Sequence, residues 1–418
     1  MWPDTRFFVV VVSLATDLVA GHSWTIPLAT RAVTSKSNTT GNDKWQLPWS
    51  HHPHWRVHSK TSNIGLTDWV DRTDNQWYID IFVGRPPQKF TVLWDTGSSD
   101  LVIPGINCTT CGNHTLFKEA DSRSFVPLNG GEKPLEYSTG LSPIPFLEPE
   151  SIGGITAFDT IGFSPELLSQ SQEFLYCNKY PPCFAYGPVD SILGISPFNE
   201  DERDQTNLFW NLWELEKFDE PVFSLYLARS GSQVTLGGVD PTKFTGNISF
   251  VPLTDNPLYS DDWALEQTAL YINGSLFQPS AASSSRPGPP HSPHRPYPPH
   301  GLHDSWRPHH LPHHPPSHSR SQPHTYAGAP CAEIDRVATD FTFILGDGRN
   351  SVSVTLPRSA FNLGEYPGMP GICQAVFNNK AIKDGINNFW VLGSPLLKAY
   401  YTVWNGVDRK IGWAEVKV

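Results

Sequence analysis

Short apolar runs alternate with turn residues along most of the chain from Trp77 onward. Residues 77–83 alternate apolar and polar side chains, residues 84–87 (Gly-Arg-Pro-Pro) carry a turn signal, and residues 90–94 form the next apolar run. Short runs of this kind, bounded by Gly, Pro, Asn and Asp, predict β-strands. The sequence therefore predicts a mostly β protein built in two halves.

One stretch has the period of an amphipathic helix. Between Thr206 and Lys217, apolar residues recur on one face of a helix with 3.6 residues per turn. These residues are Leu208, Phe209, Leu212 and Leu215. We interpret the neighbouring Trp210 and Trp213 as packing residues rather than ligand-binding ones.

A segment in the second half breaks the β pattern. Residues 279–330 are rich in Pro, His and Ser, show no apolar periodicity and cannot form a packed core. Apolar strand sequence resumes at residues 341–345. The histidines could bind a transition metal, but they lack ordered spacing, so we favour a chance His-Pro tract and predict no metal site.

The N-terminus predicts export. Arg6 precedes an apolar run that ends in small residues near Ala20 and Gly21, which is typical of a signal peptide over residues 1–21. A buried strand or a membrane anchor is the alternative, although the run is short for a membrane span. Residues 22–68 are basic and nearly free of acids. This range indicates a propeptide, with a disordered leader as the alternative.

Composition narrows the class of partner. With 418 residues the chain can form two lobes with their own cores. Its formal net charge of -11 disfavours nucleic acid as a partner.

Six cysteines in an exported chain indicate three disulfides, with a redox or zinc pair at Cys108 and Cys111 as the alternative. Five glycosylation sequons agree with export. They begin at Asn38, Asn107, Asn113, Asn247 and Asn273.

The candidate chemistry lies directly after the apolar run 90–94. There the turn Asp95-Thr-Gly-Ser places a carboxylate at the end of a strand. Two other apolar runs, residues 191–194 and 389–393, each end in a glycine. With these motifs in this order, the chain resembles the pepsin-like aspartic endopeptidases over residues 75–278 and 331–418.

The resemblance implies a role for each residue of the turn. Asp95 is one catalytic carboxylate, Thr96 fixes the turn, and Ser98 hydrogen-bonds the carboxylate. Gly97 leaves room for the water and the substrate. Tyr137 matches the tyrosine of the family's flap, which closes over substrate; an ordinary strand tyrosine is the alternative.

The family reaction needs a second aspartate turn, which the chain lacks. Two close carboxylates share a proton; one takes a proton from water while the other donates to the peptide carbonyl. No second Asp-Thr-Gly or Asp-Ser-Gly occurs. Asp304 is the one acid within residues 279–330, but Trp306 stands where glycine is needed. The second catalytic Asp is therefore unknown. Either an error in the coding sequence hides it, or the chain is a genuine pseudo-protease.

These observations predict an all-β, bilobal, pepsin-like fold with two β-barrel-like lobes and a cleft between them. We expect the N-terminal lobe at residues 69–250 and the C-terminal lobe at residues 251–418. We also expect each disulfide to close locally within one lobe. The predicted pairs are Cys108–Cys111, Cys177–Cys183 and Cys331–Cys373.

The predicted function is that of an aspartic-type endopeptidase made as a zymogen, a hydrolase without a cofactor. Its partner would be a polypeptide substrate or a peptide-like inhibitor. We expect a monomer without a membrane anchor, secreted or vacuolar. Because one aspartate turn is missing, we predict that this chain is inactive. The alternative from another class is an inactive pepsin-fold binding protein.

Overall fold

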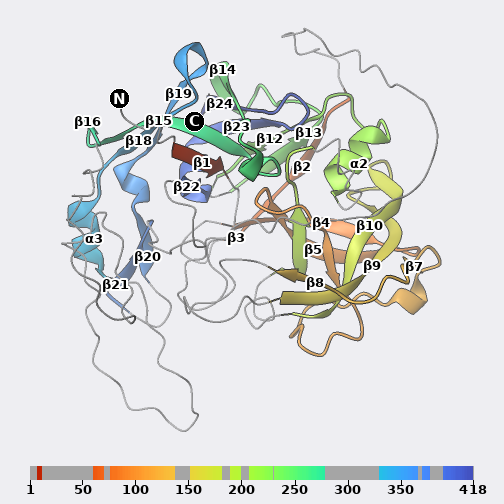
Figure 1. The fold of residues 1–418 in the computed structure, drawn as a ribbon. Coiled ribbons are helices and arrows are strands. Elements are labelled where there is room, and N and C mark those ends of the chain that lie inside the picture. The colour runs from red at the N-terminus through yellow and green to blue at the C-terminus, as the bar shows by residue number, and fades with distance from the viewer. Residues whose placement is uncertain are drawn as a thin grey trace, which may run out of the picture.

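Strands dominate the structure, a computed structural model, so the predicted all-β bilobal class is confirmed (Figure 1). The helices are short, and none of those among the described residues has the length and apolar character that crossing a bilayer requires. The structure describes residues 7–11, 60–69, 76–136, 151–180, 189–198, 207–228, 230–277, 329–365, 370–376 and 389–417.

The first lobe is built on a nine-stranded sheet. Its main path runs β11-β5-β4-β9-β10-β6, while β3 pairs with β4, and β7 and β8 pair with β9. The strands are β3 (Thr67–Trp69), β4 (Gln76–Val83), β5 (Gln88–Asp95), β6 (Val102–Pro104), β7 (Val126–Pro127), β8 (Lys133–Glu136), β9 (Ser151–Gly162), β10 (Leu168–Lys179) and β11 (Ser191–Gly194). Strand β5, which ends at Asp95, lies inside this sheet between β11 and β4.

The second lobe is built on a six-stranded sheet with the path β19-β18-β15-β1-β22, where β16 pairs with β15. The strands are β1 (Phe7–Val11), β15 (Ala264–Ile272), β16 (Ser275–Leu276), β18 (Phe341–Leu345), β19 (Val352–Leu356) and β22 (Phe389–Leu392). Strand β1 comes from the range predicted as a signal peptide, yet it lies inside the sheet of the second lobe (Figure 1).

A third sheet joins strands from both halves of the sequence in the order β14-β24-β23-β12-β13-β2. The strands are β2 (Ser62–Gly65), β12 (Val222–Tyr226), β13 (Gln233–Leu236), β14 (Phe244–Pro252), β23 (Tyr400–Asn405) and β24 (Lys410–Val416). Strand β2 lies within the predicted propeptide, residues 22–68, and pairs with β13. The limits of the propeptide and of the two lobes stay predictions.

The remaining elements are small. A three-stranded sheet contains β17 (Ala329–Pro330), β21 (Ile372–Ala375) and β20 (Asn362–Glu365). The α-helices are α2 (Leu208–Glu214), α3 (Cys331–Val337) and α4 (Ser394–Leu397), and the 3-10 helices are Glu119–Asp121, Pro257–Tyr259, Gly348–Asn350 and Arg358–Ala360.

Helix α2 lies within the range expected to be helical. The side chain of Asn207 caps it by accepting hydrogen bonds from the backbone N–H groups of Phe209 and Trp210. The indole of Trp210 is buried and donates to the carbonyl of Ser196 at 2.8 Å. Trp213 packs edge-on against Phe198. Both tryptophans therefore contribute to packing.

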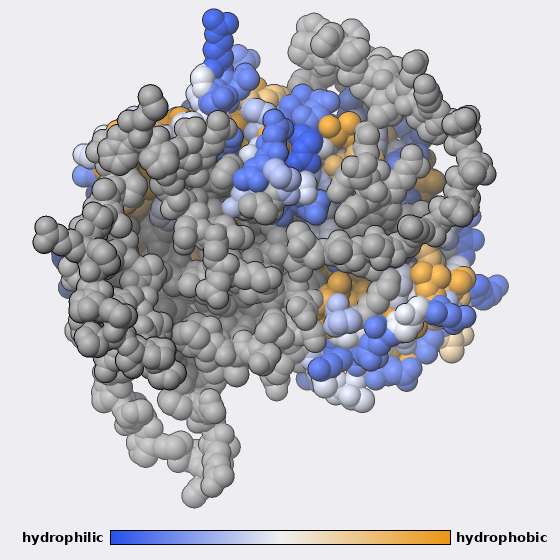
Figure 2. All heavy atoms as spheres, viewed as in Figure 1, coloured by the Kyte–Doolittle hydropathy of each residue, from blue (hydrophilic) through white to orange (hydrophobic). Residues whose placement is uncertain are grey.

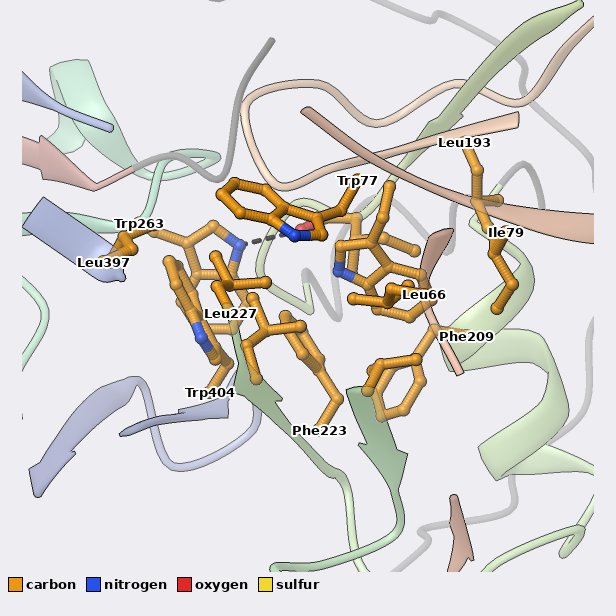
Figure 3. Packing of buried hydrophobic residues seen from close by; sticks show 14 of the residues in the cluster. Leu66, Trp77, Ile79, Leu193, Phe209, Phe223, Leu227, Trp263, Leu397 and Trp404 are labelled. Atoms are coloured by element: carbon orange, nitrogen blue, oxygen red, sulfur yellow. Dashed lines mark hydrogen bonds between the residues drawn. The ribbon is translucent and has the colours of Figure 1, made fainter. Parts of the chain in front are cut away.

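Aromatic rings connect the three large sheets. Phe223 of β12 stacks on Trp404 of β23 at 5.6 Å between ring centroids, and Trp263 meets both rings edge-on (Figure 3). Trp94 of β5 contacts Phe223 at 5.4 Å. Because all four side chains are buried, this cluster fixes the position of the strand that carries Asp95.

Most apolar side chains of the described residues are internal. The face shown in Figure 2 is largely hydrophilic where it is coloured, with separate hydrophobic areas. The exposed large apolar residues are Phe82, Ile106, Val126, Leu128, Leu215 and Leu276. Three of them lie in strands of different position in the chain, Phe82 in β4, Val126 in β7 and Leu276 in β16.

Two of the three predicted disulfides are present, Cys108–Cys111 and Cys331–Cys373. The third prediction, Cys177–Cys183, is corrected at Cys177, which is a free buried thiol; Cys183 lies outside the described residues. The thiol of Cys177 donates to the carbonyl of Lys179 at 3.0 Å, and burial raises its pKa to about 12. This cysteine is thus held as a protonated packing residue.

Candidate active site

Asp95 is the last residue of a central strand. The end of β5 is buried from Val92 to Asp95, and β11 pairs with it in parallel, with Gly194 opposite Asp95. The backbone N–H of Ile195 donates to the carbonyl of Asp95 at 2.7 Å. The sheet therefore fixes the backbone at the point where the carboxylate leaves the strand.

The turn after Asp95 supplies hydrogen-bond donors to its carboxylate. Oδ1 accepts a hydrogen bond from the backbone N–H of Gly97 at 2.8 Å, and Oδ2 accepts one from the Ser98 hydroxyl at 2.6 Å. Thr96 is buried beside them. The structure thus brings together the four residues that the sequence singles out in this turn.

Burial sets the protonation of Asp95. The side chain is 0% exposed, and desolvation raises its pKa from 3.8 to about 6, although the bonds from Ser98 and Gly97 oppose the shift. Asp95 therefore exchanges its proton in weakly acidic solution, and below that range it is a neutral acid.

Gly194 is required for the approach of β11 to the turn. A Cβ atom at this position would lie 2.6 Å from the backbone nitrogen of Asp100 and 2.7 Å from the backbone carbon and oxygen of Ser98. Backbone atoms cannot move aside at such distances, as the end of a flexible side chain can. The glycine at the end of this apolar run thus lets two segments of backbone pass close together behind Asp95.

Trp263 supports the same place from the second lobe. Its indole N–H donates to the carbonyl of Ile195 at 2.8 Å, and its side chain is fully buried. Ile195 is also the residue whose N–H holds the carbonyl of Asp95. Sequence reasoning missed this contact of Trp263, because nothing in a single sequence shows which distant carbonyl an indole meets.

The second lobe repeats the strand arrangement around Asp95, and the described part of its central strand carries no carboxylate. In the first lobe, β5 pairs antiparallel with β4 and parallel with β11. In the second lobe, β1 pairs antiparallel with β15 and parallel with β22. Strand β1 has the sequence Phe-Phe-Val-Val-Val and thus holds no titratable side chain. Its pairing with its two neighbours thus matches that of β5 in the first lobe.

Asp262 is a carboxyl that the sequence did not single out. It is 7% exposed, directly precedes Trp263, and its Oδ1 has no hydrogen-bond partner. Burial, helped by the charge of Asp261, raises its pKa from 3.8 to about 7. Asp262 is thus a buried carboxyl next to the tryptophan that supports the backbone at Asp95.

The other predicted site residues divide into two groups. Tyr137, which follows β8, and Asp304 lie outside the described residues, as does Asn38. The remaining sequon asparagines have exposed side chains, as glycan attachment requires. They are Asn107, Asn113, Asn247 and Asn273. Within the described ranges, no group of three or more His, Cys, Asp or Glu side chains is arranged to hold a metal ion.

Comparison with known proteins gives a consistent result. The sequence model of the family described as eukaryotic aspartyl protease matches residues 76–286 and 317–416. The chain is 26% identical over 359 residues to pepsin A of Rhinolophus ferrumequinum, covering 82% of both proteins. It is 33% identical over 221 residues to chymosin of Ovis aries, covering 52% of this chain and 53% of that one.

A third relative matches part of the chain at higher identity. A pregnancy-associated glycoprotein of Equus caballus is 35% identical over 202 residues, which is 47% of this chain and 48% of that protein. The two ranges of the family match contain Asp95, Gly194 and Gly393, and they leave out residues 287–316. The unmatched stretch lies inside the Pro/His/Ser-rich segment.

Proposed function

The chain belongs to the eukaryotic aspartyl protease family, and from this premise we propose that its fold serves the hydrolysis of peptide bonds by an aspartic-type mechanism. The substrate class is polypeptide in an extended conformation, and a peptide-like inhibitor would bind in the same way. The reaction uses a water molecule and two aspartates, and it needs neither a metal nor a covalent intermediate.

The hydrogen bonding and the raised pKa of Asp95 are the observation that supports this proposal most directly. Its two oxygens accept hydrogen bonds from Gly97 and Ser98, and burial raises its pKa to about 6. A carboxyl whose pKa lies near the working pH can exchange a proton with a bound water. Asp95 thus has the position and the acidity expected of one half of a catalytic pair.

No second Asp-Thr-Gly or Asp-Ser-Gly turn occurs in the sequence, so we infer that this chain does not cleave peptides at an enzymatic rate. With Asp95 alone, no proton can be shared, and no second acid protonates the peptide carbonyl. General acid–base help is worth roughly 10²–10⁴-fold per group. An inactive binding protein is the second candidate function, and β1 favours it, because this strand supplies no carboxylate beside β22.

A cleavage and binding assay tests both functions. We expect the full chain to show no pepstatin-sensitive cleavage of a denatured protein substrate between pH 3 and pH 6. We also expect it to bind pepstatin in this range, measured by calorimetry, and Asp95→Asn to weaken that binding. Asp121→Asn, which changes an exposed acid in a 3-10 helix, is the matched control and should leave binding unchanged.

Two results would contradict the proposal. If the chain cleaves peptides and Asp95→Asn abolishes the cleavage, a second acid exists, and Asp304 becomes the residue to test. If Asp95→Asn and Asp121→Asn bind pepstatin as the unchanged chain does, Asp95 does not line a peptide-binding cleft.

We further propose that the protein is an exported, glycosylated monomer, secreted or vacuolar, made as a zymogen with residues 22–68 as its propeptide. The exposure of Asn107, Asn113, Asn247 and Asn273 supports glycan attachment. Two disulfides support passage through an oxidising compartment.

A further inference from the structure

We propose that the second lobe contains a strand-accepting site between β15 and β22, and that the chain's own N-terminal segment, Phe7–Val11, fills it as β1. We call this place the strand site. It takes an apolar extended segment that runs parallel to β22 and antiparallel to β15. The proposal rests on strand pairing and not on the proposed hydrolysis.

The pairing of β1 is that of an interior strand. Phe7 to Val10 pair with Gln267 to Ala264 of β15 on one side. Phe8 to Val11 pair with Phe389 to Leu392 of β22 on the other side. A strand that is paired along both edges is an integral part of its sheet, since both rows of its backbone groups face partners.

The first lobe shows what this place holds in a complete unit. There β5 lies between β4 and β11, and its pairing with β11 ends with Asp95 opposite Gly194. In the second lobe the pairing with β22 ends with Val11 opposite Leu392, the residue before Gly393. The strand site thus corresponds to the place of the strand that carries the catalytic turn.

The sequence of the segment suits such a place. Phe-Phe-Val-Val-Val is a continuous run of aromatic and β-branched residues, the composition of a strand buried on both faces. Its neighbours Ala264, Leu265 and Leu392 are buried. The sequence around β15 and β22 does not provide the strand locally, because residues 279–330 replace the stretch in which it would lie.

An empty strand site would be costly. Without an occupant, the facing edges of β15 and β22 would hold unpaired N–H and C=O groups inside the lobe, and a buried group without a partner costs about 1–3 kcal/mol. A second strand of suitable composition is therefore bound when the first is removed. Cleavage of the predicted signal peptide after Gly21 would vacate the site, so this segment acts as an export leader and, while attached, as a strand of the second lobe.

An engineered disulfide in the full chain tests the pairing. Phe8 lies opposite Glu266, and directly opposed residues of an antiparallel pair are close enough for a disulfide. We expect Phe8→Cys with Glu266→Cys to form this bridge in the full-length chain refolded with its N-terminus intact, as read by peptide mapping. The matched control, Phe8→Cys with Thr268→Cys, is two residues out of register and should not form it. Absence of the first bridge, or equal formation of both, would overturn the proposal.

Binding in trans tests the strand site itself. We expect a synthetic peptide of residues 5–13 to raise the Tm of a chain that begins at residue 22, and the same peptide with Val9→Pro to leave it unchanged, because proline cannot donate to the ladder. No shift with either peptide, or the same shift with both, would contradict the strand site. If the shortened chain does not fold, the disulfide experiment in the full chain still decides.

Discussion

The two lobes share one strand arrangement, but they build it from different parts of the sequence. In the first lobe, β4, β5 and β11 all come from residues 76–194, and β5 ends at Asp95. In the second lobe, β15 and β22 come from the C-terminal part, whereas the strand between them, β1, comes from the far N-terminus.

This difference separates the structural role of a central strand from its chemical role. Any apolar extended segment can satisfy the backbone of the sheet, because pairing uses groups that every residue except proline has. Catalysis needs a particular carboxyl at the end of that strand, with donors placed around it. Among the described residues, the central strand of the first lobe ends in such a carboxyl with two donors beside it, whereas the corresponding strand of the second lobe ends at Val11.

The largest expected effect concerns the buried carboxyl of each lobe, Asp262 and Asp95. Folding raises their pKa from 3.8 to about 7 and about 6, respectively. Below pH 3.8 both states are protonated; above it the unfolded chain loses its proton first, so stability falls until the folded pKa is passed. This fall is worth about 4 kcal/mol for Asp262 and about 3 kcal/mol for Asp95, at 1.36 kcal/mol per pKa unit.

Substitution by Asn removes the titration while keeping the shape. We therefore expect the free energy of unfolding of Asp262→Asn, relative to that of the unchanged chain, to rise by about 4 kcal/mol from pH 4 to pH 8. For Asp95→Asn the expected rise is about 3 kcal/mol. Urea unfolding at each pH measures both. Asp121→Asn, at an exposed acid, should follow the unchanged chain. A larger rise in unfolding free energy for Asp95→Asn than for Asp262→Asn would contradict this prediction.

The first lobe could be predicted from the sequence because its signals are local. The apolar run 90–94 and the turn that follows it are adjacent in sequence to Asp95, whereas the distant glycine of residues 191–194 is indicated by the order of motifs that the family shares. The hydrogen bond from Ser98 to Asp95 is the one that the family resemblance implies, and the backbone N–H of Gly97 adds a second bond within the same turn. A helix at α2 likewise follows from a short periodic pattern with Asn207 as its cap.

The second lobe could be predicted less well because its determinants are distant. The run at Phe7–Val11 indicates an export signal, with a buried strand as the alternative, and only its partners β15 and β22 show the pairing that it adopts in the fold. The raised pKa of Asp262 depends on burial that no neighbouring residue in the sequence shows. Cys177 has a nearby cysteine in the sequence, yet its thiol faces the carbonyl of Lys179.

A smaller effect is expected where β11 passes behind Asp95. Gly194→Ala places a methyl group against backbone atoms of Asp100 and Ser98, and overpacking of this kind costs about 1–3 kcal/mol. The matched control is Gly65→Ala in β2, where an added Cβ meets nothing within 4 Å. We expect urea unfolding to show a clear loss of stability for Gly194→Ala and little change for Gly65→Ala. Equal losses would mean that the close approach behind Asp95 is not tightly packed.

The smallest expected effect compares two buried tryptophans that donate to carbonyls far away in the sequence, one between the lobes and one within the first lobe. Trp263 donates to the carbonyl of Ile195 at 2.8 Å, whereas Trp77 of β4 donates to the carbonyl of Ala228 at 3.3 Å. The longer bond is the weaker one, because N–H···O bonds are most favourable near 2.9 Å.

Replacing each indole by phenylalanine removes its N–H. The carbonyl of Ile195 then loses the donor Trp263, which costs about 1–3 kcal/mol for a buried group, whereas the carbonyl of Ala228 still accepts from the Ser232 hydroxyl at 2.9 Å. We therefore expect Trp263→Phe to lower the free energy of unfolding by about 1–2 kcal/mol, and Trp77→Phe by less than about 1 kcal/mol. Trp263→Phe should also weaken pepstatin binding, because Ile195 holds the backbone of Asp95. If Trp77→Phe proves the more damaging of the two, the second lobe does not support the first-lobe site through this bond, and the aromatic packing around Phe223 is left as the main connection between the lobes.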